Sequence, residues 1–224
     1  MSRKASSGHK TLSAGRSVAG HPRKKRLLCV MGGEVTEKQY LKMLDDVSTT
    51  ATVTRKCCPR DPANLAIAAM KAKRSEDKAS CSKDGGPYES YSATFVLTDV
   101  DEFSSDKLRS AERTCKAEGM RLIISNPCFE VWLIDHERTC SSSWTSTKEC
   151  ERQAHNLGLT TGRNNKEIVK DKLEPHINAA CKNVASHRTQ EHERLRYQLD
   201  TTGFAPWTDM PIVVDAVLPD VRVG

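Results

Sequence analysis

Short apolar runs alternate with longer segments of helical periodicity over the first part of the chain. Continuous apolar runs predict strands that are buried on both faces, and weaker alternation at residues 50–55 predicts one more strand. The expected strands are residues 26–31, 50–55, 94–97 and 120–124. Strands that alternate with helices are typical of a parallel sheet flanked by helices, so we expect an α/β fold.

Helices are expected between these strands and after the last of them. The predicted helices are residues 37–47, 61–79, 105–118 and 125–137. Thr36 is a preferred N-cap residue for the first helix, and Asp61 followed by Pro62 suits the start of the second. Gly119 is a typical residue to end the third.

The remaining segments have weaker patterns. Residues 1–22 are rich in Ser, Gly, Lys and Arg and lack periodicity, which predicts a disordered basic tail. The other expectations are a loop at 80–90, an irregular stretch with one short helix at 138–163, a helical stretch at 166–199 interrupted at Pro175, and a final helix near 210–218. Together they predict one domain over residues 23–224, with a core at about 26–137 and a helical C-terminal extension at about 145–220.

The net charge of +6 is unevenly distributed along the chain. Residues 1–26 hold eight Lys or Arg and no acid, whereas the rest of the chain holds 27 basic and 29 acidic residues. A basic tail attracts polyanions because it releases their condensed counterions. Nucleic-acid contacts are therefore expected there, although a purely solvated tail has the same composition. The residues expected to make these contacts are Arg23, Lys24, Lys25 and Arg26.

Hydropathy and cysteine usage restrict the class of protein further. No apolar run approaches the roughly 18–20 residues that a membrane-spanning helix requires. No apolar stretch follows the basic N-terminus, as it would in a secretory signal. A cytoplasmic protein with no membrane partner is expected. The nine cysteines include no CxxC pair, so we expect free thiols rather than disulfides or a zinc site.

Acidic side chains follow three of the predicted strands. Glu34 and Glu37 come after the first strand, Asp99 and Asp101 after the third, and Glu130 after the fourth. The carboxyl ends of neighbouring parallel strands meet at one edge of a sheet, where ligands bind. Paired carboxylates suit Mg²⁺ or Mn²⁺, which take one or two such ligands and keep several waters. The pattern therefore indicates a metal site at this edge.

The DxD pair alone leaves other interpretations open. Asp99 and Asp101 could simply end the strand and cap the next helix. The same pair begins the phosphatases of HAD type, in which the first Asp is a nucleophile, and it occurs in metal-dependent glycosyltransferases. The HAD interpretation requires a supporting lysine motif downstream, and the sequence has no such motif.

Three segments in this order resemble the RloB family, whose domain is related to the Toprim fold of topoisomerases, primases and some nucleases. The family pattern is E-G-x-x-T-E-x-x-Y after an apolar strand, then D-x-D-E-F, then S-N-P-x-F-E-x-W-x-x-x-H. The chain matches this pattern at Gly33, Thr36, Glu37, Tyr40, Asp99, Asp101, Glu102, Phe103, Ser125, Asn126, Pro127, Phe129, Glu130, Trp132 and His136. Trp207-Thr208-Asp209, before an apolar helix, is also similar to the C-terminal end of the family.

The resemblance implies a Mg²⁺- or Mn²⁺-dependent nuclease of prokaryotic phage or mobile-element defence. Its implied substrate is nucleic acid, with RNA or tRNA favoured over DNA, and its implied protein partner is another component of the defence system. The residues implied to hold the metal are Asp99, Asp101 and Glu37. Those implied to act in catalysis are Glu34, Glu130 and His136, and Asn126 is implied to contact the nucleic acid.

One position departs from the family pattern. Gly32 stands where the family has a glutamate, which Toprim enzymes use as the acid or base beside the metal. Glycine has no side chain to bind a metal or transfer a proton. Glu34 could reach the same loop, but a misplacement of about 1 Å can cost about a hundredfold in rate. The alternative is therefore a catalytically weakened Toprim-like module that binds nucleic acid or regulates another protein.

Structural roles also remain open for several matched residues. Glu37 at the start of a helix interacts favourably with the helix dipole whether or not it binds a metal. Asn126 can begin the helix that follows it, and Trp132 can pack in the core. His136 can be a locally hydrogen-bonded histidine rather than a catalytic one.

Overall fold

A mixed sheet forms the centre of the computed structural model, which describes residues 24–80, 90–100 and 103–221. Its strands are β1 (Lys25–Met31), β2 (Ala51–Cys57), β3 (Ala93–Asp99), β4 (Arg121–Asn126) and β7 (Trp207–Thr208). They lie in the order β2-β1-β3-β4-β7, the first four parallel and β7 antiparallel to β4. The four predicted strands are confirmed, and β7 adds an antiparallel edge that the sequence pattern did not predict.

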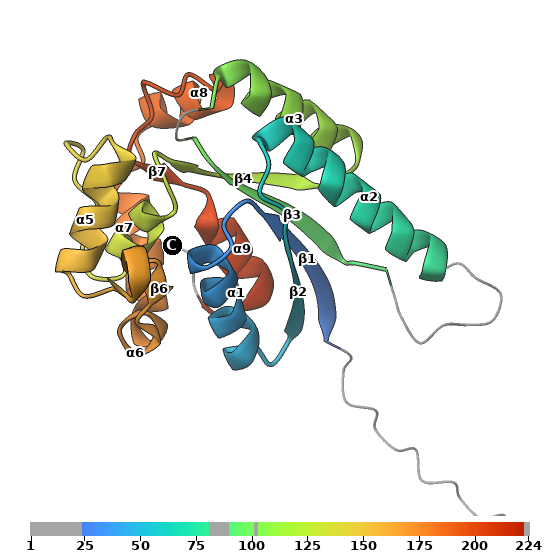
Figure 1. Cartoon of the computed structure of the whole chain (residues 1–224), viewed down its shortest axis with the longest axis horizontal. Helices are drawn as coiled ribbons and strands as arrows, with labels where there is room; N and C mark the ends of the chain where they lie inside the picture. The colour runs from blue at the N-terminus through green and yellow to red at the C-terminus, as the bar shows by residue number, and fades with distance from the viewer. Residues whose placement is uncertain (1–23, 81–89, 101–102, 222–224) are drawn as a thin grey trace, which may run out of the picture.

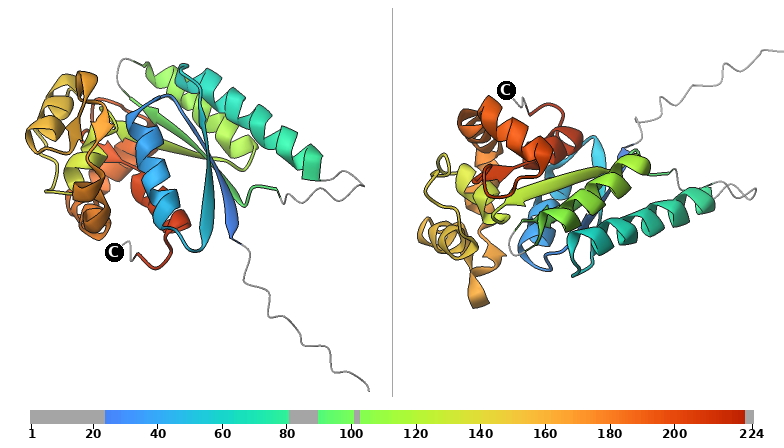
Figure 2. Two further views of the ribbon diagram at one scale, coloured as in Figure 1. Left: turned by 60° about the horizontal axis from the view of Figure 1, so that its bottom comes forward. Right: turned by 90° about the horizontal axis from the view of Figure 1, so that it is seen from above.

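Helices cover both faces of this sheet, as Figures 1 and 2 show. One face carries α2 (Pro62–Ser80) and α3 (Ser105–Ala117), and the other carries α1 (Thr36–Val47) and α9 (Met210–Val217). Side chains alternate along β1, so they pack into two hydrophobic cores, one on each face of the sheet. Leu28 and Val30 pack toward α2 and α3, whereas Leu27, Cys29 and Met31 pack toward α1 and α9. The predicted α/β architecture is confirmed.

A helical lobe lies beyond the carboxyl end of the sheet, at the left of Figure 1. Its elements are α4 (Glu130–Asp135), α5 (Thr147–Asn156), β5 (Thr160–Thr161), the 3₁₀ turn η1 (Arg163–Asn165), β6 (Glu167–Ile168), α6 (Lys170–Leu173), the 3₁₀ turn η2 (Glu174–His176) and α7 (Ile177–His187). The next helix, α8 (Gln190–Gln198), lies apart from this lobe, beside α3 at the top of Figure 1. The α4 helix contacts both α5 and α7. After α8 the chain returns to the sheet through β7 and α9, so the C-terminal part completes the core as well as extending it.

Several local predictions differ from the structure. Thr36 is the first helical residue of α1 rather than its N-cap, because its hydroxyl donates to the main-chain oxygen of Lys166 at 2.9 Å. The helix predicted over residues 125–137 is shorter, since β4 continues to Asn126. The stretch predicted as helical from residue 166 begins instead with β6, which pairs with β5.

Other local predictions are confirmed or lie outside the described residues. Gly119 has a positive φ of 62° directly after the end of α3, as its place at a helix end requires. The described cysteines are all free thiols. Within the described ranges no helix is both long and apolar enough to cross a bilayer. The basic tail at 1–22 and most of the loop at 80–90 fall outside those ranges.

The strand order reverses direction between β1 and β3. From β1 the chain passes through α1 on one face to β2, then returns through α2 on the opposite face to β3. In open α/β sheets such a switch point leaves a crevice outside the carboxyl ends of the two strands, and ligands bind there. The topology therefore places the candidate site after Met31 and Asp99, the last residues of β1 and β3.

Candidate active site

A cavity of about 680 Å³ opens at this switch point. Loops at the carboxyl end of the sheet line it, together with residues of the helical lobe. Its lining residues are Gly32, Gly33, Glu34, Val35, Thr36 and Glu37 after β1, Pro59, Arg60 and Asp61 before α2, Thr98, Asp99 and Phe103 around the end of β3, Phe129 and Glu130 at α4, and Lys166. The volume lies within the range of about 300–1,000 Å³ that is usual for ligand sites.

Asp99 is the last residue of β3 and lies on the floor of the cavity. Burial raises the pKa of its carboxyl group well above the usual range, and the nearby carboxylates of Glu37 and Glu130 raise it further. A main-chain hydrogen bond from Phe129 and the positive charge of Lys166 act in the opposite direction. Three acidic side chains are thus close enough to repel one another.

The Glu37 carboxylate lies against the backbone of Gly33. A Cβ atom at residue 33 would overlap this carboxylate, so a glycine is required there for the observed conformation. Burial raises the pKa of Glu37, while hydrogen bonds from the main chain of Glu37 itself and of Gly33 lower it. Glu130 raises it as well. Glu37 therefore faces the cavity as a constrained carboxylate beside Asp99.

Lys166 provides positive charge at this acidic floor. Its Nζ atom lies 3.0 Å from Glu130 Oε1 and 2.6 Å from Glu151 Oε1. Burial alone would lower the pKa of Lys166, but the two carboxylates raise it above its usual value. The ammonium group therefore stays charged at neutral pH, and it offsets Glu130, which is only 2% exposed.

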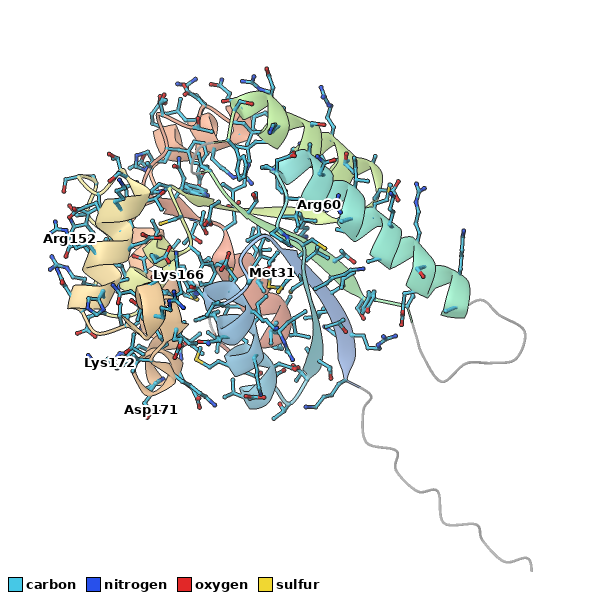
Figure 3. The ribbon with its side chains drawn as sticks, viewed as in Figure 1. Met31, Arg60, Arg152, Lys166, Asp171 and Lys172 are labelled. Atoms are coloured by element: carbon cyan, nitrogen blue, oxygen red, sulfur yellow. The ribbon has the colours of Figure 1, made fainter. Side chains whose placement is uncertain are left out.

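The segment that carries Lys166 is attached to α1 by two hydrogen bonds. The Thr36 hydroxyl donates to the Lys166 main-chain oxygen at 2.9 Å, and the Ile168 amide donates to Gln39 Oε1 at 2.9 Å. Figure 3 shows Lys166 in the helical lobe and Arg60 just before α2, so the walls of the cavity come from separate parts of the fold. Neither residue was among the predicted site residues.

The structure brings together only some of the residues predicted from the sequence. Glu37, Asp99 and Glu130 share the cavity floor, and Glu34 is exposed at its mouth. Asp101 lies outside the described residues. His136 does not line the cavity: its Nε2 atom lies 3.0 Å from the Tyr40 hydroxyl and its Nδ1 atom 2.9 Å from the Trp132 carbonyl oxygen.

The residues predicted to bind nucleic acid also lie away from the cavity. Asn126 is buried and donates from Nδ2 to the main-chain oxygen of Thr201 at 2.8 Å. Lys24, Lys25 and Arg26 lie at the amino end of β1, whereas the cavity is at the carboxyl end of that strand. With a rise of about 3.3 Å per residue, the length of β1 separates them by roughly 20 Å. Arg23 lies outside the described residues.

The donor set of the floor suits a hard divalent cation. Glu37 and Asp99 offer carboxylate oxygens that face the same cavity, and Mg²⁺ takes one or two carboxylates together with waters. Lys166 is already paired with Glu130 and Glu151, so it leaves the other two carboxylates without full compensation. Over the described ranges no group of three or more His, Cys, Asp or Glu side chains converges as a metal cage. The residues therefore fit a partly hydrated cation held by two carboxylates.

Gly32 leaves space beside this floor. A Cβ atom built at residue 32 meets nothing within 4 Å, and the residue lines the cavity. A side chain at this position would therefore be accommodated without a clash at its Cβ. The glutamate that the family pattern has here is absent from the chain, but the room for it remains.

One comparison with known proteins finds a related family. The family model described as RloB-like protein matches residues 27–217, which is most of the chain. The match includes every described residue of the cavity floor. No curated protein and no solved structure gives a match.

Proposed function

Because the chain belongs to the RloB-like family, we propose that it is a Mg²⁺-dependent nuclease that hydrolyses phosphodiester bonds in the cavity between β1 and β3. The observation that carries this proposal is the buried carboxyl group of Asp99. It lies between Glu37 and Glu130 at the switch point of the sheet, and Lys166 compensates only part of their charge. A site of this composition favours a bound cation, and a phosphodiester is a substrate that such a cation attracts.

Each residue of the proposed site would have a separate role. Asp99 and Glu37 would hold the cation, and Asp101, from the sequence pattern, would join them. Mg²⁺, when bound, orients water and stabilises the negative charge that develops on the phosphoryl group. Lys166 would hold Glu130 in place through their ion pair, and Glu34, exposed at the cavity mouth, would be the candidate acid or base.

The alternative function is a catalytically weakened module that binds nucleic acid or regulates a partner. The observation that favours it is Gly32, because no side chain at this position can transfer a proton. The space beside Gly32 is compatible with both functions. The two are distinguished by whether wild-type protein cleaves nucleic acid in a metal-dependent manner.

The substrate and biological setting of the proposal come from the family resemblance. RNA or tRNA is the preferred substrate over DNA, and the setting is prokaryotic defence against phages or mobile elements, together with a partner protein of that system. The relation to the Toprim fold is part of the same proposal. The parallel order of β1 to β4 and the acidic end of β3 support it.

The test is a cleavage assay on tRNA, single-stranded RNA and DNA with Mg²⁺, Mn²⁺ or a chelator. We expect cleavage that requires the metal and falls about a hundredfold or more in Asp99→Ala, because the metal loses a ligand. Asp171→Ala is a matched control, since Asp171 is an exposed carboxylate of α6 that does not line the cavity (Figure 3). Cleavage that persists in Asp99→Ala or in chelator would rule out this site. Binding without any cleavage would favour the alternative.

A further inference from the structure

The mouth of the cavity differs in chemistry from its acidic floor. Phe103, Val35 and Pro59 line it, and Val35 is one of the exposed large apolar residues, with 38% of its surface accessible. Phe103 is half-buried, and its main-chain amide donates to the Val100 oxygen at 2.9 Å, which holds the residue close to the end of β3. An aromatic ring therefore lies at the entrance, above the carboxylates.

Basic side chains lie next to this apolar mouth. Arg60 is exposed, lines the cavity and makes no ion pair with any residue in the described ranges. The Lys107 ammonium group lies 5.8 Å from the centre of the Phe103 ring and 4.0 Å from Asp61 Oδ2. The Asp61 carboxylate is already held by Asn64, whose Nδ2 donates to it at 2.7 Å. Two cations and one aromatic ring thus share the entrance.

An aromatic ring and nearby cations match the two halves of a nucleotide. A nucleobase stacks on an aromatic face, and the adjoining phosphates pair with Lys and Arg. The acidic floor would repel a phosphate that entered alone, so binding energy must come from the mouth. At about 680 Å³, in the range of ligand sites, the cavity is large enough for a base at the mouth and an adjoining phosphate at the floor.

We propose that Phe103 is a stacking platform for an unpaired nucleobase, and that Arg60 and Lys107 bind the phosphates beside it. The substrate class is a single-stranded segment, because both faces of a base inside a duplex are already stacked on neighbouring bases. This proposal deepens the proposed function by naming the strand state that enters the site. It concerns binding, so it can stand or fall independently of cleavage at Asp99.

The test measures binding of the full chain to labelled RNA of about 12 nucleotides, within the usual site sizes of roughly 4–16. Three probes are compared in Ca²⁺ buffer by fluorescence anisotropy: a single strand, its duplex, and a single strand with abasic central positions. Phe103→Ala should weaken single-strand binding about five- to 150-fold, from the ordinary range for loss of a stacked base. It should have little effect on the duplex or the abasic strand, because neither offers a free base.

Matched variants separate stacking from general damage. Phe103→Trp should retain single-strand binding, because the indole ring also stacks. Tyr197→Ala should leave binding unchanged: Tyr197 is 82% exposed on α8 and lies near the Lys116 ammonium, 5.6 Å from its ring centre, but does not line the cavity. Tyr197 is therefore an aromatic residue beside a cation, as Phe103 is, but it lies away from the cavity. Thermal unfolding of each variant checks that the fold is intact.

The role of Arg60 predicts a different signature. Arg60→Ala should reduce the slope of log affinity against log salt concentration by about 0.7, the value for one phosphate contact on a single strand. Phe103→Ala should leave that slope unchanged. Arg121→Ala is the control, because Arg121 is exposed at the amino end of β4, on the opposite edge of the sheet.

Each outcome decides between the proposals. Equal losses on the single strand, duplex and abasic strand would overturn the stacking role, and so would unchanged binding in Phe103→Ala or no binding by wild type. Mononucleotide that displaces the strand at low concentration would show that the site takes free nucleotides and would overturn the strand assignment. Selective loss of single-strand binding in a protein that cleaves nothing would support the stacking site and count against the nuclease. Metal-dependent cleavage that is unchanged in Phe103→Ala would support the nuclease and count against the stacking site.

Discussion

Two aspartates lie at strand ends of the same sheet, and their surroundings are opposite in kind. Asp209, directly after β7, accepts hydrogen bonds from Trp207 Nε1 at 2.8 Å and from the Ile124 amide at 3.0 Å. Arg196 donates to it from Nε at 3.0 Å and from Nη2 at 2.7 Å. Asp99, at the end of β3, faces two other carboxylates and shares one lysine with them. The first carboxylate is fully partnered, and the second is left in excess negative charge.

The difference separates a structural acid from a functional one. The side-chain hydrogen bonds of Asp209 join parts of the fold, since Trp207, Ile124 and Arg196 belong to β7, β4 and α8. Arg188 adds to the same group: its Nη2 atom donates to the Thr208 oxygen at 2.6 Å. The Asp99 carboxyl group accepts a main-chain hydrogen bond from Phe129, but its burial and the repulsion by Glu37 and Glu130 work against the ionised form. A group that costs stability where it stands is a candidate for function.

The largest effect expected from this comparison is on stability. Asp209→Asn should lower the free energy of unfolding by about 3 kcal/mol, because it leaves Arg196 buried without its counter-charge. Asp99→Asn should leave stability at or above the wild-type value at neutral pH, because it removes a carboxylate that Glu37 and Glu130 repel. Urea unfolding of both variants measures this. A loss in Asp99→Asn as large as that in Asp209→Asn would erase the distinction.

The same comparison explains what the sequence could predict. The strands β1, β3 and β4 were predictable because their apolar runs are local signals, and Asp99 was identified because it ends one of them. The two-residue strand β7 has no periodicity of its own and exists only through its pairing with β4. The Asp209 network was missed for the same reason, since its partners come from β4, β7 and α8.

Within the site, the predictable residues were those in contiguous motifs. Glu37, Asp99 and Glu130 each follow a strand, so topology alone was expected to gather them. Lys166 was missed because it lies 36 residues beyond Glu130, outside the matched motifs, and only tertiary folding brings the two together. His136 and Asn126 match the family motif, but hydrogen bonds to Tyr40 and Thr201 hold them outside the cavity.

His136 provides a third case, a buried titratable group that is partnered but uncharged. Burial lowers its pKa to about 4, and His176 nearby disfavours a second positive charge. The unfolded chain binds this proton near pH 6.5, so stability should be complete above that pH and fall as the pH drops toward 4. The loss should reach about 3 kcal/mol, from about 1.4 kcal/mol per pKa unit. Urea unfolding of wild type and His136→Gln between these pH values measures it.

Other groups titrate over the same pH range, so the stability profile of wild type is compared with that of His136→Gln. Only the difference between the two profiles reports on His136. His136→Gln should lose part of the pH dependence, with a flatter profile between pH 4 and 6.5. Parallel profiles would mean that His136 is not held neutral in the folded state. That result would restore it as a candidate for proton transfer.

The smallest expected effect concerns the excess negative charge around Asp99. Gly32→Glu places one more carboxylate at a cavity position where a Cβ atom meets nothing within 4 Å. If Gly32 only weakens the site, the variant should increase Mg²⁺-dependent cleavage about tenfold, less than the roughly 10²–10⁴-fold of a well-placed acid or base. In chelator it should be slightly less stable than wild type, because a further like charge is added to the floor.

Gly32→Gln is the matched control, since it fills the same space without a charge or a transferable proton. A gain with Glu but not with Gln would mean that the chain retains a nuclease site lacking one group. No gain in either variant, with wild type already active, would mean that Glu34 or Glu130 has taken over proton transfer. No cleavage in any of the three would favour the nucleic-acid-binding module, and the unbalanced carboxylates around Asp99 would then serve to bind a cation rather than to cleave.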